Sequence, residues 1–451
     1  MVLAIGIIAT VILLVVGVPV AFAFGGSLAY MVLSLGYSPQ MLLPYGFSKV
    51  NSVVLMAMPL FILCGGIMEK GGIGKSLVDL IEHFIGRIRG GLAPVEVVAS
   101  AVFGAITGSG AATLTCIGSI VAPRMTEKHY PKGITAAVIA NAAPLGMLIP
   151  PSAMMILYAW SGTQSVLACF LATLVPGIIL TVFQSAVSLV MLHGHKEITV
   201  TDAIPAQEWT KTLGVKTKSA IPAIVMPVII LGGIYGGVFT AMEAAAVATL
   251  YSIPVAIFVY RGLNGKTLLK TIRSSCISIG AIFSMTIMLN MICKVFILED
   301  LPSQIMNILM GISSNKTVIM LMINIFMLLI GMIMDDVSSV LLCTPILLPI
   351  VTQLGISPIH FAAILGVNLG MGTVTPPCAP FLYMATNLVG ADFKDTLKPC
   401  LMLIAFAWLP TLLLTIFAHF GIQIHQLRID PFPEFQCVIL NTHQRSSLRY
   451  N

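Results

Sequence analysis

The sequence predicts an all-α polytopic membrane protein, built as an inverted repeat with two re-entrant hairpins and two discontinuous helices. Composition is the first reason: of 451 residues, 58% are hydrophobic and only 9% are charged. Soluble domains carry about 25% charged residues, so this chain has too few charges to cover a water-exposed surface. Most of its helices must therefore face lipid.

A repeated segment is the second reason. Ser109–Ala159 in the first half of the chain aligns without a gap on Asp335–Ala385 in the second half. Gly146 then coincides with Gly372, and three prolines coincide with three prolines. Those pairs are Pro123 and Pro349, Pro150 and Pro376, and Pro151 and Pro377. Hydrophobic copies that Gly and Pro interrupt at equivalent places are typical of secondary transporters.

Ten spans are expected outside the hairpins, since a helix needs about 20 residues to cross the bilayer core. The first two share Val2–Gly36, which is broken at Gly17-Val18-Pro19. The others are Ser52–Met68, Gly133–Trp160, Ser165–Leu192, Ile221–Phe239, Thr240–Tyr260, Cys276–Leu298, Ile359–Asn387 and Cys400–Phe420. Lysine and arginine collect in His193–Ser219 and Arg261–Ser275, which are predicted to be cytoplasmic loops.

An amphipathic, basic segment occupies Glu69–Gly91. Its apolar side chains share one helical face and are Leu77, Leu80, Ile81, Phe84, Ile85 and Ile88. The pattern predicts a helix lying in the plane of the membrane interface.

The first re-entrant hairpin is predicted at Leu92–Ala122, which is apolar except for Glu96 and carries Thr107-Gly108-Ser109-Gly110 at its middle. Positive residues flank the segment on both sides, so both its ends are expected in the cytoplasm. Its tip at Gly108–Gly110 would be non-helical at membrane depth. Such backbone is tolerated only where protein or water surrounds it.

The second hairpin is predicted at Thr317–Val351, with Asp335-Asp336 at the equivalent tip. Glu299, Asp300 and Lys316 precede it, and Thr352–His360 contains no Lys or Arg. Its mouth is therefore expected outside the cytoplasm. The two hairpins would enter from opposite faces, as an inverted repeat requires.

These elements divide the chain into five segments. They are 1–91 (scaffold spans and interfacial helix of the first repeat), 92–164 (first hairpin and broken helix), 165–316 (linking span, cytoplasmic loop and second scaffold), 317–399 (second hairpin and broken helix) and 400–451 (last span and C-terminal tail).

A helix interrupted in mid-membrane follows each hairpin, at Asn141–Ser152 and at Asn368–Pro377. Paired prolines cannot continue the helical ladder, so carbonyls near residues 146–149 and 372–375 lose their partners. Such carbonyls can bind a hard cation such as sodium, and the N-termini of half-helices can receive an anion. The alternative is a pair of proline kinks whose backbone groups are satisfied by neighbouring Ser, Thr or water.

Asp335 and Asp336 are adjacent acidic residues within a long apolar run. Intramembrane carboxylates are functional candidates. One of the two could instead cap the helix that starts at Val337-Ser338-Ser339. The sequence leaves both roles open.

Short motifs occur in a fixed order along both halves of the chain. In the first half they are Gly17-Val-Pro19-Val-Ala-Phe, Gly65-Gly-Ile-Met, Arg89-Gly-Gly-Leu-Ala, Thr107-Gly-Ser-Gly-Ala-Ala-Thr-Leu-Thr-Cys-Ile-Gly and Ile149-Pro-Pro-Ser. In the second half they are Phe239-Thr-Ala-Met-Glu-Ala-Ala-Ala, Met334-Asp335, Thr344-Pro-Ile-Leu-Leu-Pro and Thr375-Pro-Pro. With these motifs, from about Gly17 to Pro410, the chain resembles the large membrane subunit of tripartite ATP-independent periplasmic (TRAP) transporters, within the ion-transporter superfamily.

The resemblance implies a secondary transporter and not an enzyme. It implies an elevator-type, sodium-coupled importer of small organic anions, such as C4-dicarboxylates or sugar acids, in a bacterial inner membrane. Two partners are implied: a small four-helix membrane subunit and a periplasmic substrate-binding protein. Sodium ions would be required, without an organic cofactor or nucleic acid.

The same resemblance implies that the hairpin tips and the broken helices frame the sites. The residues expected at the substrate are Ser109, Gly110, Thr113, Ser152, Asp336 and Thr375. Those expected at sodium, partly through backbone carbonyls, are Ser109, Asn141, Gly146, Asp335, Asn368, Gly370, Gly372 and Thr373.

Three other functions stand beside this one. A stand-alone carboxylate or inorganic-anion antiporter of the same superfamily would need no binding protein. An intramembrane enzyme is disfavoured, because no nucleophile–base pair accompanies the hairpins. A passive channel is disfavoured, because a break repeated in both halves suits alternating access better.

Overall fold

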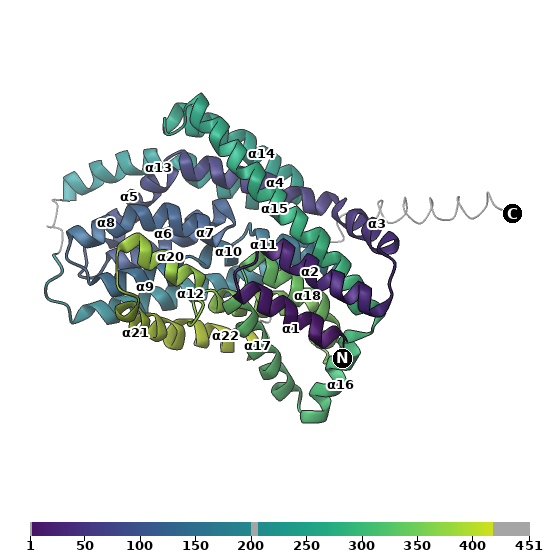
Figure 1. Ribbon diagram of the computed structural model, residues 1–451. Coiled ribbons are helices and arrows are strands. Elements are labelled where there is room, and N and C mark those ends of the chain that lie inside the picture. The colour runs from purple at the N-terminus through teal and green to yellow at the C-terminus, as the bar shows by residue number, and fades with distance from the viewer. Residues whose placement is uncertain (1, 200–205, 418–451) are drawn as a thin grey trace. The chain divides into compact units, whose positions relative to one another are not determined.

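The computed structural model describes residues 2–199 and 206–417, and within these ranges the chain is helical, without a strand (Figure 1). Eight of the described helices are long and apolar enough to cross a bilayer, and a bent pair, Lys132–Leu148 with Ala153–Ser161, could make a ninth. The all-α prediction is confirmed. Both arms of the second hairpin are among the eight, so its re-entrant course stays a prediction. The tail from residue 418 and residues 200–205 of the predicted loop lie outside the described residues.

Helices follow one another through both halves with short connections. Those of the first half are α1 (Val2–Val15), α2 (Val20–Leu35), α3 (Pro39–Val50), α4 (Val53–Lys70), α5 (Ile73–Ile85), α6 (Leu92–Thr107), α7 (Gly110–Thr113), the π-helical η1 (Leu114–Gly118), α8 (Ser119–Glu127), α9 (Lys132–Ala142), α10 (Leu145–Leu148), α11 (Ala153–Ser161) and α12 (Val166–His193). Those of the second half are α13 (Ala206–Tyr235), α14 (Ala241–Pro254), η2 (Val255–Val259), α15 (Gly265–Leu298), α16 (Leu301–Ile312), α17 (Lys316–Ile333), α18 (Asp336–Gln353), α19 (Pro358–Gly372), α20 (Pro380–Val389), α21 (Phe393–Leu403), η3 (Ile404–Trp408) and α22 (Leu409–Phe417).

The register of the repeat also relates the helix boundaries of the two halves. Within the aligned segment, the first residues of α9 and α19 coincide, and so do the last residues of α8 and α18. When the same register is extended beyond the segment, the start of α12 falls one position from the start of α21, and the start of α5 falls two positions from the start of α16. The repeat therefore covers most of the chain, and the amphipathic α5 has a counterpart, α16, that the sequence analysis did not predict.

α15 shows where the two halves differ. In the register of the repeat, its first residue coincides with the first residue of α3, and its last residue lies two positions beyond the last residue of α4. One continuous helix of 34 residues thus corresponds to two helices of the first half, which are separated at Asn51 and Ser52. The sequence analysis predicted no helix at α3.

The predicted loop Arg261–Ser275 is shorter than expected, because α15 already starts at Gly265, and its cytoplasmic side stays a prediction. A capping box fixes this start: the N–H of Thr267 donates to Asn264 Oδ1 at 2.9 Å, and the N–H of Asn264 donates to Thr267 Oγ1 at 2.8 Å. Such a pair satisfies N–H groups that would otherwise lack acceptors. The helix therefore continues through the basic residues that the sequence analysis placed in a loop.

α13 likewise starts at Ala206, earlier than the predicted span Ile221–Phe239, so the predicted loop His193–Ser219 is partly helical. α13 packs on α5, and α6 packs on α5 as well. Leu77 and Val78 of α5 are buried, whereas Phe84 is exposed. The amphipathic helix is confirmed, while its place at the membrane interface stays a prediction.

Both breaks in the interrupted helices begin later than predicted. Asn141 lies inside α9, and the first break consists of residues 143–144 and 149–152 around the single turn α10. Asn368 lies inside α19, and the second break spans residues 373–379. The helices continue beyond each asparagine because the prolines that interrupt the ladder come later in each segment. The Pro150-Pro151 and Pro376-Pro377 peptide bonds are both cis.

The two broken helices form the core of the described ranges. Residues 135–159 and 361–374 are all buried. α20 and α21 pack against α9, although they belong to the other half of the chain (Figure 1). The segments that resemble each other are therefore also the most deeply packed.

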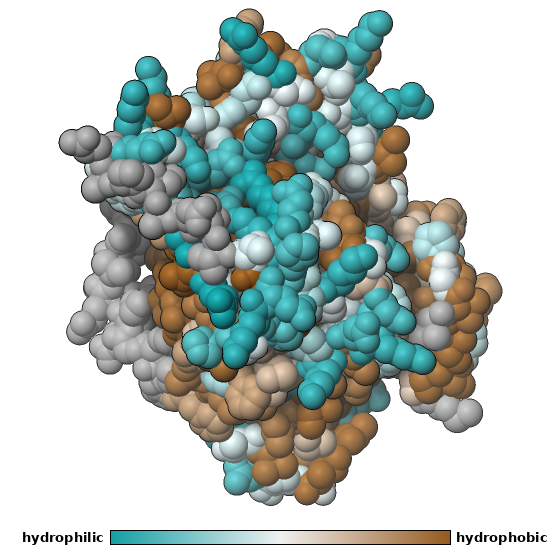
Figure 2. All heavy atoms as spheres, turned by 90° about the vertical axis from the view of Figure 1, so that its left-hand side faces the viewer, coloured by the Kyte–Doolittle hydropathy of each residue, from teal (hydrophilic) through white to brown (hydrophobic). Residues whose placement is uncertain are grey.

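Charged residues join the end of the first hairpin to α5. Arg124 donates to Glu82 Oε2 at 2.6 Å and to Asp79 Oδ1 at 2.7 Å, and Lys128 donates to Glu82 Oε1 at 3.2 Å. Burial raises the pKa of Glu82, but the hydrogen bonds from Arg124 and Lys128 outweigh it, so this pKa lies below its ordinary value. Figure 2 faces the side where α8 joins α9, and hydrophilic residues gather on that face.

Candidate functional site

The tip of the first hairpin lies directly against the first break. Gly108 has a φ of +62°, a left-handed conformation that glycine adopts at no steric cost. Its carbonyl oxygen accepts the N–H of Ala153 at 3.3 Å. A Cβ at this position would lie 2.7 Å from the carbonyl oxygen of Pro151. The hairpin turns at a glycine because the backbone of the broken helix occupies the space of a side chain.

Ser109 and Thr113 gather oxygen atoms at this tip. Ser109 Oγ accepts the N–H of Ala112 at 3.4 Å, and Thr113 Oγ1 donates to the carbonyl oxygen of Ser109 at 2.8 Å. Thr113 Oγ1 also lies 3.4 Å from Thr107 Oγ1. A Cβ on Gly146 would meet Thr113 Oγ1 and lie 2.7 Å from the carbonyl oxygen of Ser109. Three of the predicted residues are thus together, and hard cations favour such oxygens.

Each hairpin crosses its broken helix at a pair of glycines. A Cβ on Gly104 would meet the Cα of Gly146, and a Cβ on Gly372 would lie 2.7 Å from the Cα of Gly331. Gly146 and Gly372 are equivalent in the repeat, and Gly104 and Gly331 lie one position apart when its register is extended. The backbones of hairpin and broken helix therefore touch in both halves, with no room for a side chain between them.

The tip of the second hairpin is built around Asp335, which caps α18. The N–H of Ser338 donates to Asp335 Oδ2 at 3.4 Å, and Ser338 Oγ donates to Asp335 Oδ1. The capping role is therefore confirmed for Asp335. Asp336 follows in the first turn of α18, where a carboxylate suits the positive end of the helix dipole. Asp335 is exposed, and Asp336 is half-buried.

Asn324 and Asn368 join the second hairpin to its broken helix. Asn368 Nδ2 donates to Asn324 Oδ1 at 2.7 Å and to the carbonyl oxygen of Asn324 at 3.1 Å. Asn368 Oδ1 is fully buried and has no hydrogen-bond donor among the described residues. Leaving a buried acceptor unsatisfied costs about 1–3 kcal/mol. A cation beside Asn368 would satisfy this oxygen.

Thr373 and Gly370 continue this second cluster at the end of α19. Thr373 is buried, and its Oγ1 donates to the carbonyl oxygen of Gly370 at 2.7 Å. A Cβ on Gly370 would lie 3.0 Å from the Trp408 ring. Thr375 is half-buried, and its Oγ1 donates to the carbonyl oxygen of Met371 at 2.6 Å. Its lone pairs stay available to a ligand.

Asn141 has a packing role apart from the hairpin tips. Its Oδ1 accepts the Trp408 Nε1–H at 3.0 Å, and its Nδ2 donates to the carbonyl oxygen of Ala137 at 2.8 Å and to Cys400 Sγ at 3.3 Å. Its carbonyl oxygen accepts from Gln184 Nε2 at 2.7 Å. These contacts tie α9 to α12, α21 and η3. A sodium ion at Asn141 Oδ1 would have to share this oxygen with the Trp408 hydrogen bond.

Ser152 caps the second part of the first broken helix. Its Oγ accepts the N–H of Met155 at 3.4 Å and donates to the carbonyl oxygen of Met147 at 2.5 Å. With the N–H of Ala153 bound to Gly108, two of the first N–H groups of α11 are already occupied. Ser152 is also fully buried, so an arriving anion would have to displace existing contacts here.

The two hairpin units interlock. α11 packs on α18 of the second hairpin, and α20 packs on η1 and α8 of the first. A Cβ on Gly110 would lie 2.8 Å from Phe381 Cζ, so the first tip touches the second broken helix. Hairpins and broken helices therefore form one packed body.

Sequence reasoning missed Asn324 and gave no role to Thr107, Glu96 or Ser339. Glu96 is fully buried; its Oε1 accepts from Ser100 Oγ at 3.3 Å, and its Oε2 has no partner among the described residues. Ser339 Oγ is likewise without a partner there. The signal for Glu96 was its position as the one acidic residue of the first hairpin. For Asn324, a polar residue in an apolar run was the only signal.

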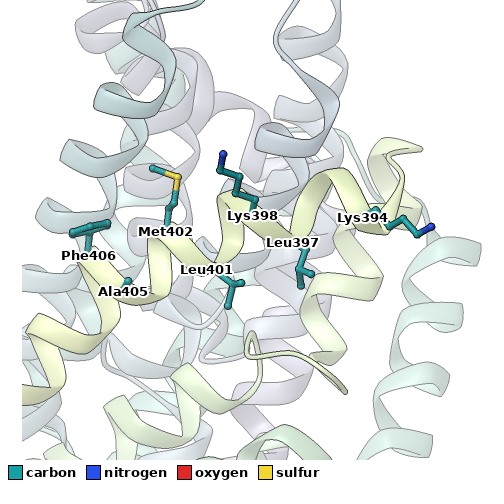
Figure 3. Close-up of a pocket in the computed structure, with 7 residues that line it drawn as sticks. All are labelled: Lys394, Leu397, Lys398, Leu401, Met402, Ala405 and Phe406. Carbon is teal, nitrogen blue, oxygen red and sulfur yellow. The ribbon is translucent and has the colours of Figure 1, made fainter.

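A surface cleft of about 340 Å³ lies on α21 and η3. Figure 3 shows its seven side chains along a single helical stretch, from Lys394 at one end to Phe406 at the other. None of them belongs to either oxygen cluster. This cleft is therefore separate from the candidate site.

Comparison with known proteins agrees with this architecture. A family model described as the DctM component of the tripartite ATP-independent periplasmic transporter matches residues 7–420. The chain is 34% identical over 374 residues to the C4-dicarboxylate TRAP transporter large permease protein DctM of Pseudomonas aeruginosa, covering 81% of this chain and 84% of that protein. It is 27% identical over 420 residues to the sialic acid TRAP transporter large permease protein SiaM of Vibrio cholerae, covering 92% and 96%.

Another relative is longer than this chain. The isethionate TRAP transporter permease protein DctMQ of Oleidesulfovibrio alaskensis is 33% identical over 403 residues, which are 89% of this chain but only 63% of that protein. Among solved structures, the YdaH transporter of Alcanivorax borkumensis matches with a TM-score of 0.56 and 17% identity, over 88% of this chain and 90% of that one. At this identity the likeness supports the fold alone.

Proposed function

The chain belongs to the DctM family of tripartite ATP-independent periplasmic (TRAP) transporters, and on that premise we propose that it imports small organic anions coupled to sodium. Proteins of this family are large permease subunits, secondary transporters of the bacterial inner membrane and not enzymes. The chain is accordingly an organic-anion permease that depends on a substrate-binding protein. Sodium coupling, the elevator mechanism and the identity of the anion are the proposed part.

The observation that carries sodium coupling is a cluster of oxygen atoms in each half of the chain, where a hairpin packs against its broken helix. In the first, the carbonyl oxygen of Ser109 and Thr113 Oγ1 lie against Gly146. In the second, Asn368 has an unsatisfied Oδ1 and is bonded to Asn324 of the hairpin helix α17. Asn368 and Thr373 belong to the same broken helix. Sodium is a hard cation that binds neutral oxygens of this kind. One ion would bind at each cluster.

The anion would bind at the residues that keep exposed surface. Ser109, Asp336 and Thr375 are half-buried, whereas Thr113 and Ser152 are fully buried. Asp336 would repel an anion unless a cation lies next to it, so binding of anion and sodium would be coupled through its charge. The names of the relatives, which include a C4-dicarboxylate, a sialic acid and an isethionate permease, support a small organic acid as the substrate class.

The packed body of hairpins and broken helices would move as a unit, in an elevator mechanism. The glycine crossings and the contact between Gly110 and Phe381 leave little freedom for one hairpin to move alone. One charge crossing 100 mV of membrane potential gains about 2.3 kcal/mol. Two sodium ions that cross with a monovalent anion carry one net positive charge, so the potential alone supports roughly 50-fold accumulation, to which the sodium gradient adds. A small four-helix membrane subunit and a periplasmic binding protein would complete the transporter.

Uptake into proteoliposomes tests the proposal. Vesicles with this chain and the small subunit are given labelled succinate, isethionate or a sialic acid, with or without an inward sodium gradient and the binding protein. Uptake that requires both supports a tripartite sodium symporter. Sodium-driven uptake without the binding protein favours the stand-alone carrier instead. Uptake that a potassium gradient of the same size drives equally well would exclude sodium coupling.

A further inference from the structure

A second cleft lies between the start of α5 and the outer arm of the first hairpin, outside both oxygen clusters. It has a volume of about 330 Å³. The end of α4 and the first turn of α5 form one wall, and η1 with the start of α8 forms the other. Lys70, Lys75, Thr115 and Ser119 line it and are all exposed. The cleft is therefore polar and open to solvent.

The cleft carries a net positive charge. Lys70 Nζ pairs with Glu69 Oε1 at 2.7 Å, whereas Lys75 forms no ion pair in the described part of the chain. The first N–H groups of α5 add to this charge, because Gly72 precedes the helix and offers no side-chain cap. A carboxylate in the cleft would meet an unpaired ammonium group and the positive end of a helix.

Small residues lead from the first hairpin tip to this cleft. Ala111, Thr115 and Ser119 follow one another at intervals of four residues and are all exposed. Residues at this spacing share one face of a helical arm. The row starts two residues after Ser109, so this face of the arm carries only small side chains between Ser109 and the cleft.

The second hairpin has no such cleft wall. In the register of the repeat, Thr115 and Ser119 correspond to Leu341, which is buried, and to Pro345. The counterpart of α5, α16, follows the acidic Glu299 instead of a lysine. The basic cleft is therefore not a general product of the repeat. It lies on the side that the sequence predicts to face the cytoplasm.

We propose that this cleft is a release subsite, where Lys70 and Lys75 bind the acidic group of the transported anion after it leaves Ser109. The inference rests on the proposed function for the identity of the anion. A bound anion here would also slow release as the cytoplasmic concentration rises. The cleft would thus set the concentration at which imported substrate inhibits further uptake.

Protection of an engineered cysteine tests occupancy without any transport. Ser119→Cys, and separately Thr115→Cys, is treated in lipid-free detergent with a charged maleimide, and labelling of that residue is read by peptide mass spectrometry. Succinate, isethionate and a sialic acid are the probes, with chloride of equal ionic strength as reference. At least one probe should slow labelling more as its concentration rises, and about fivefold at four times its Kd, because the bound fraction follows mass action. Protection should weaken as salt rises.

Charge variants decide whether the lysines are responsible. Lys70→Ala with Lys75→Ala should abolish protection, and the matched control Lys266→Ala, exposed on α15, should retain it. Protection that survives the double substitution, or that no probe produces, would overturn the proposal. Protection by phosphatidylglycerol alone would also overturn it, because the cleft would then bind a lipid headgroup.

Inhibition of uptake by internal substrate tests the release subsite independently. In proteoliposomes loaded with increasing internal substrate, the double lysine variant should need about fivefold more internal anion to halve uptake, because it loses an exposed ion pair. An unchanged inhibitory concentration contradicts the release subsite. Absence of sodium-driven uptake in the unmodified chain would instead contradict the proposed function, and the labelling result would still report on the cleft.

Discussion

A methyl group at position 146 would strike the tip of the first hairpin. In Gly146→Ala, the new Cβ would lie 2.7 Å from the carbonyl oxygen of Ser109 and 3.0 Å from Thr113 Cβ, and closer still to Thr113 Oγ1. Non-bonded heavy atoms prefer separations of about 3.5–4.0 Å. The tip must therefore retreat by about 1 Å, which is several times the variation in distance that a cation site tolerates.

Two effects should follow from this displacement. Overpacking should destabilise the protein by about 1–3 kcal/mol, and sodium should lose its ligands at the first tip. Thermal unfolding in detergent measures both. We expect the unmodified protein to melt at a higher temperature in sodium than in potassium. Gly146→Ala should melt lower and should respond much less to sodium.

Gly280→Ala is the matched control. Gly280 also lies in a helix, α15, but an added Cβ there meets no described atom within 4 Å. Alanine favours a helix by about 1 kcal/mol over glycine, so this variant should melt at the same temperature or higher and keep its response to sodium. If Gly146→Ala behaved like Gly280→Ala, the contact between tip and break would not be tight, and the sodium site would not be there.

Substitutions at three further positions separate structural from functional roles. Asp335→Asn should keep the cap on α18 and its thermal stability but weaken sodium binding, whereas Asp335→Ala should also lose about 0.5–2 kcal/mol of stability; equal sodium affinity in Asp335→Asn and the unmodified protein would exclude its charge from the site. Asn324→Ala leaves the amide of Asn368 without its side-chain acceptor, so stability should fall by about 1–3 kcal/mol and uptake should need more sodium; an unchanged sodium dependence would limit the pair to packing. Because the pKa of Glu82 is lowered, its ion pair with Arg124 stabilises the protein above the ordinary carboxyl pKa, and this stability is lost as the pH falls through the lowered value. Melting temperatures recorded from pH 7 down to pH 3 should thus converge for Glu82→Gln and the unmodified protein, and a constant difference would contradict the assignment.

Turns and breaks were the most predictable features, because their causes are local. Gly108 and the paired prolines at Pro150 and Pro376 act through their own backbone restrictions, which are visible in sequence. Both hairpin tips and both breaks were confirmed as interruptions between helices. The start of each break was less predictable, because α9 and α19 continue past their asparagines.

Contacts across the fold were beyond the sequence. Nothing local says that Asn324 meets Asn368, 44 residues later, or that Trp408 occupies Asn141 Oδ1, 267 residues away. Asn141 and Asn368 lie one position apart in the alignment of the repeat, yet Asn141 Oδ1 accepts a hydrogen bond, whereas Asn368 Oδ1 accepts none from the described residues. Only the packing of neighbouring helices separates these two roles.

The length of α15 has a mechanical consequence. At 1.5 Å per residue, its 34 residues make a rod of about 51 Å, against about 30 Å for the hydrocarbon core of a bilayer. Its first third carries Lys266, Lys270 and Arg273, all exposed. To slide along the membrane normal, the rod would have to drag these cations into lipid, at about 2.5–3.5 kcal/mol each.

The first half has a joint at Asn51 where the second half has this rigid rod. If the hairpins and broken helices move as proposed, a rod held at a constant depth would give them a stationary support, while the jointed pair α3 and α4 could bend with them. We therefore expect the part of the transporter around α15 to be stiff and the part around α3 and α4 to be flexible. A change in bilayer thickness should then bend the joint between α3 and α4 before it displaces α15, and should change the transport rate through that bend.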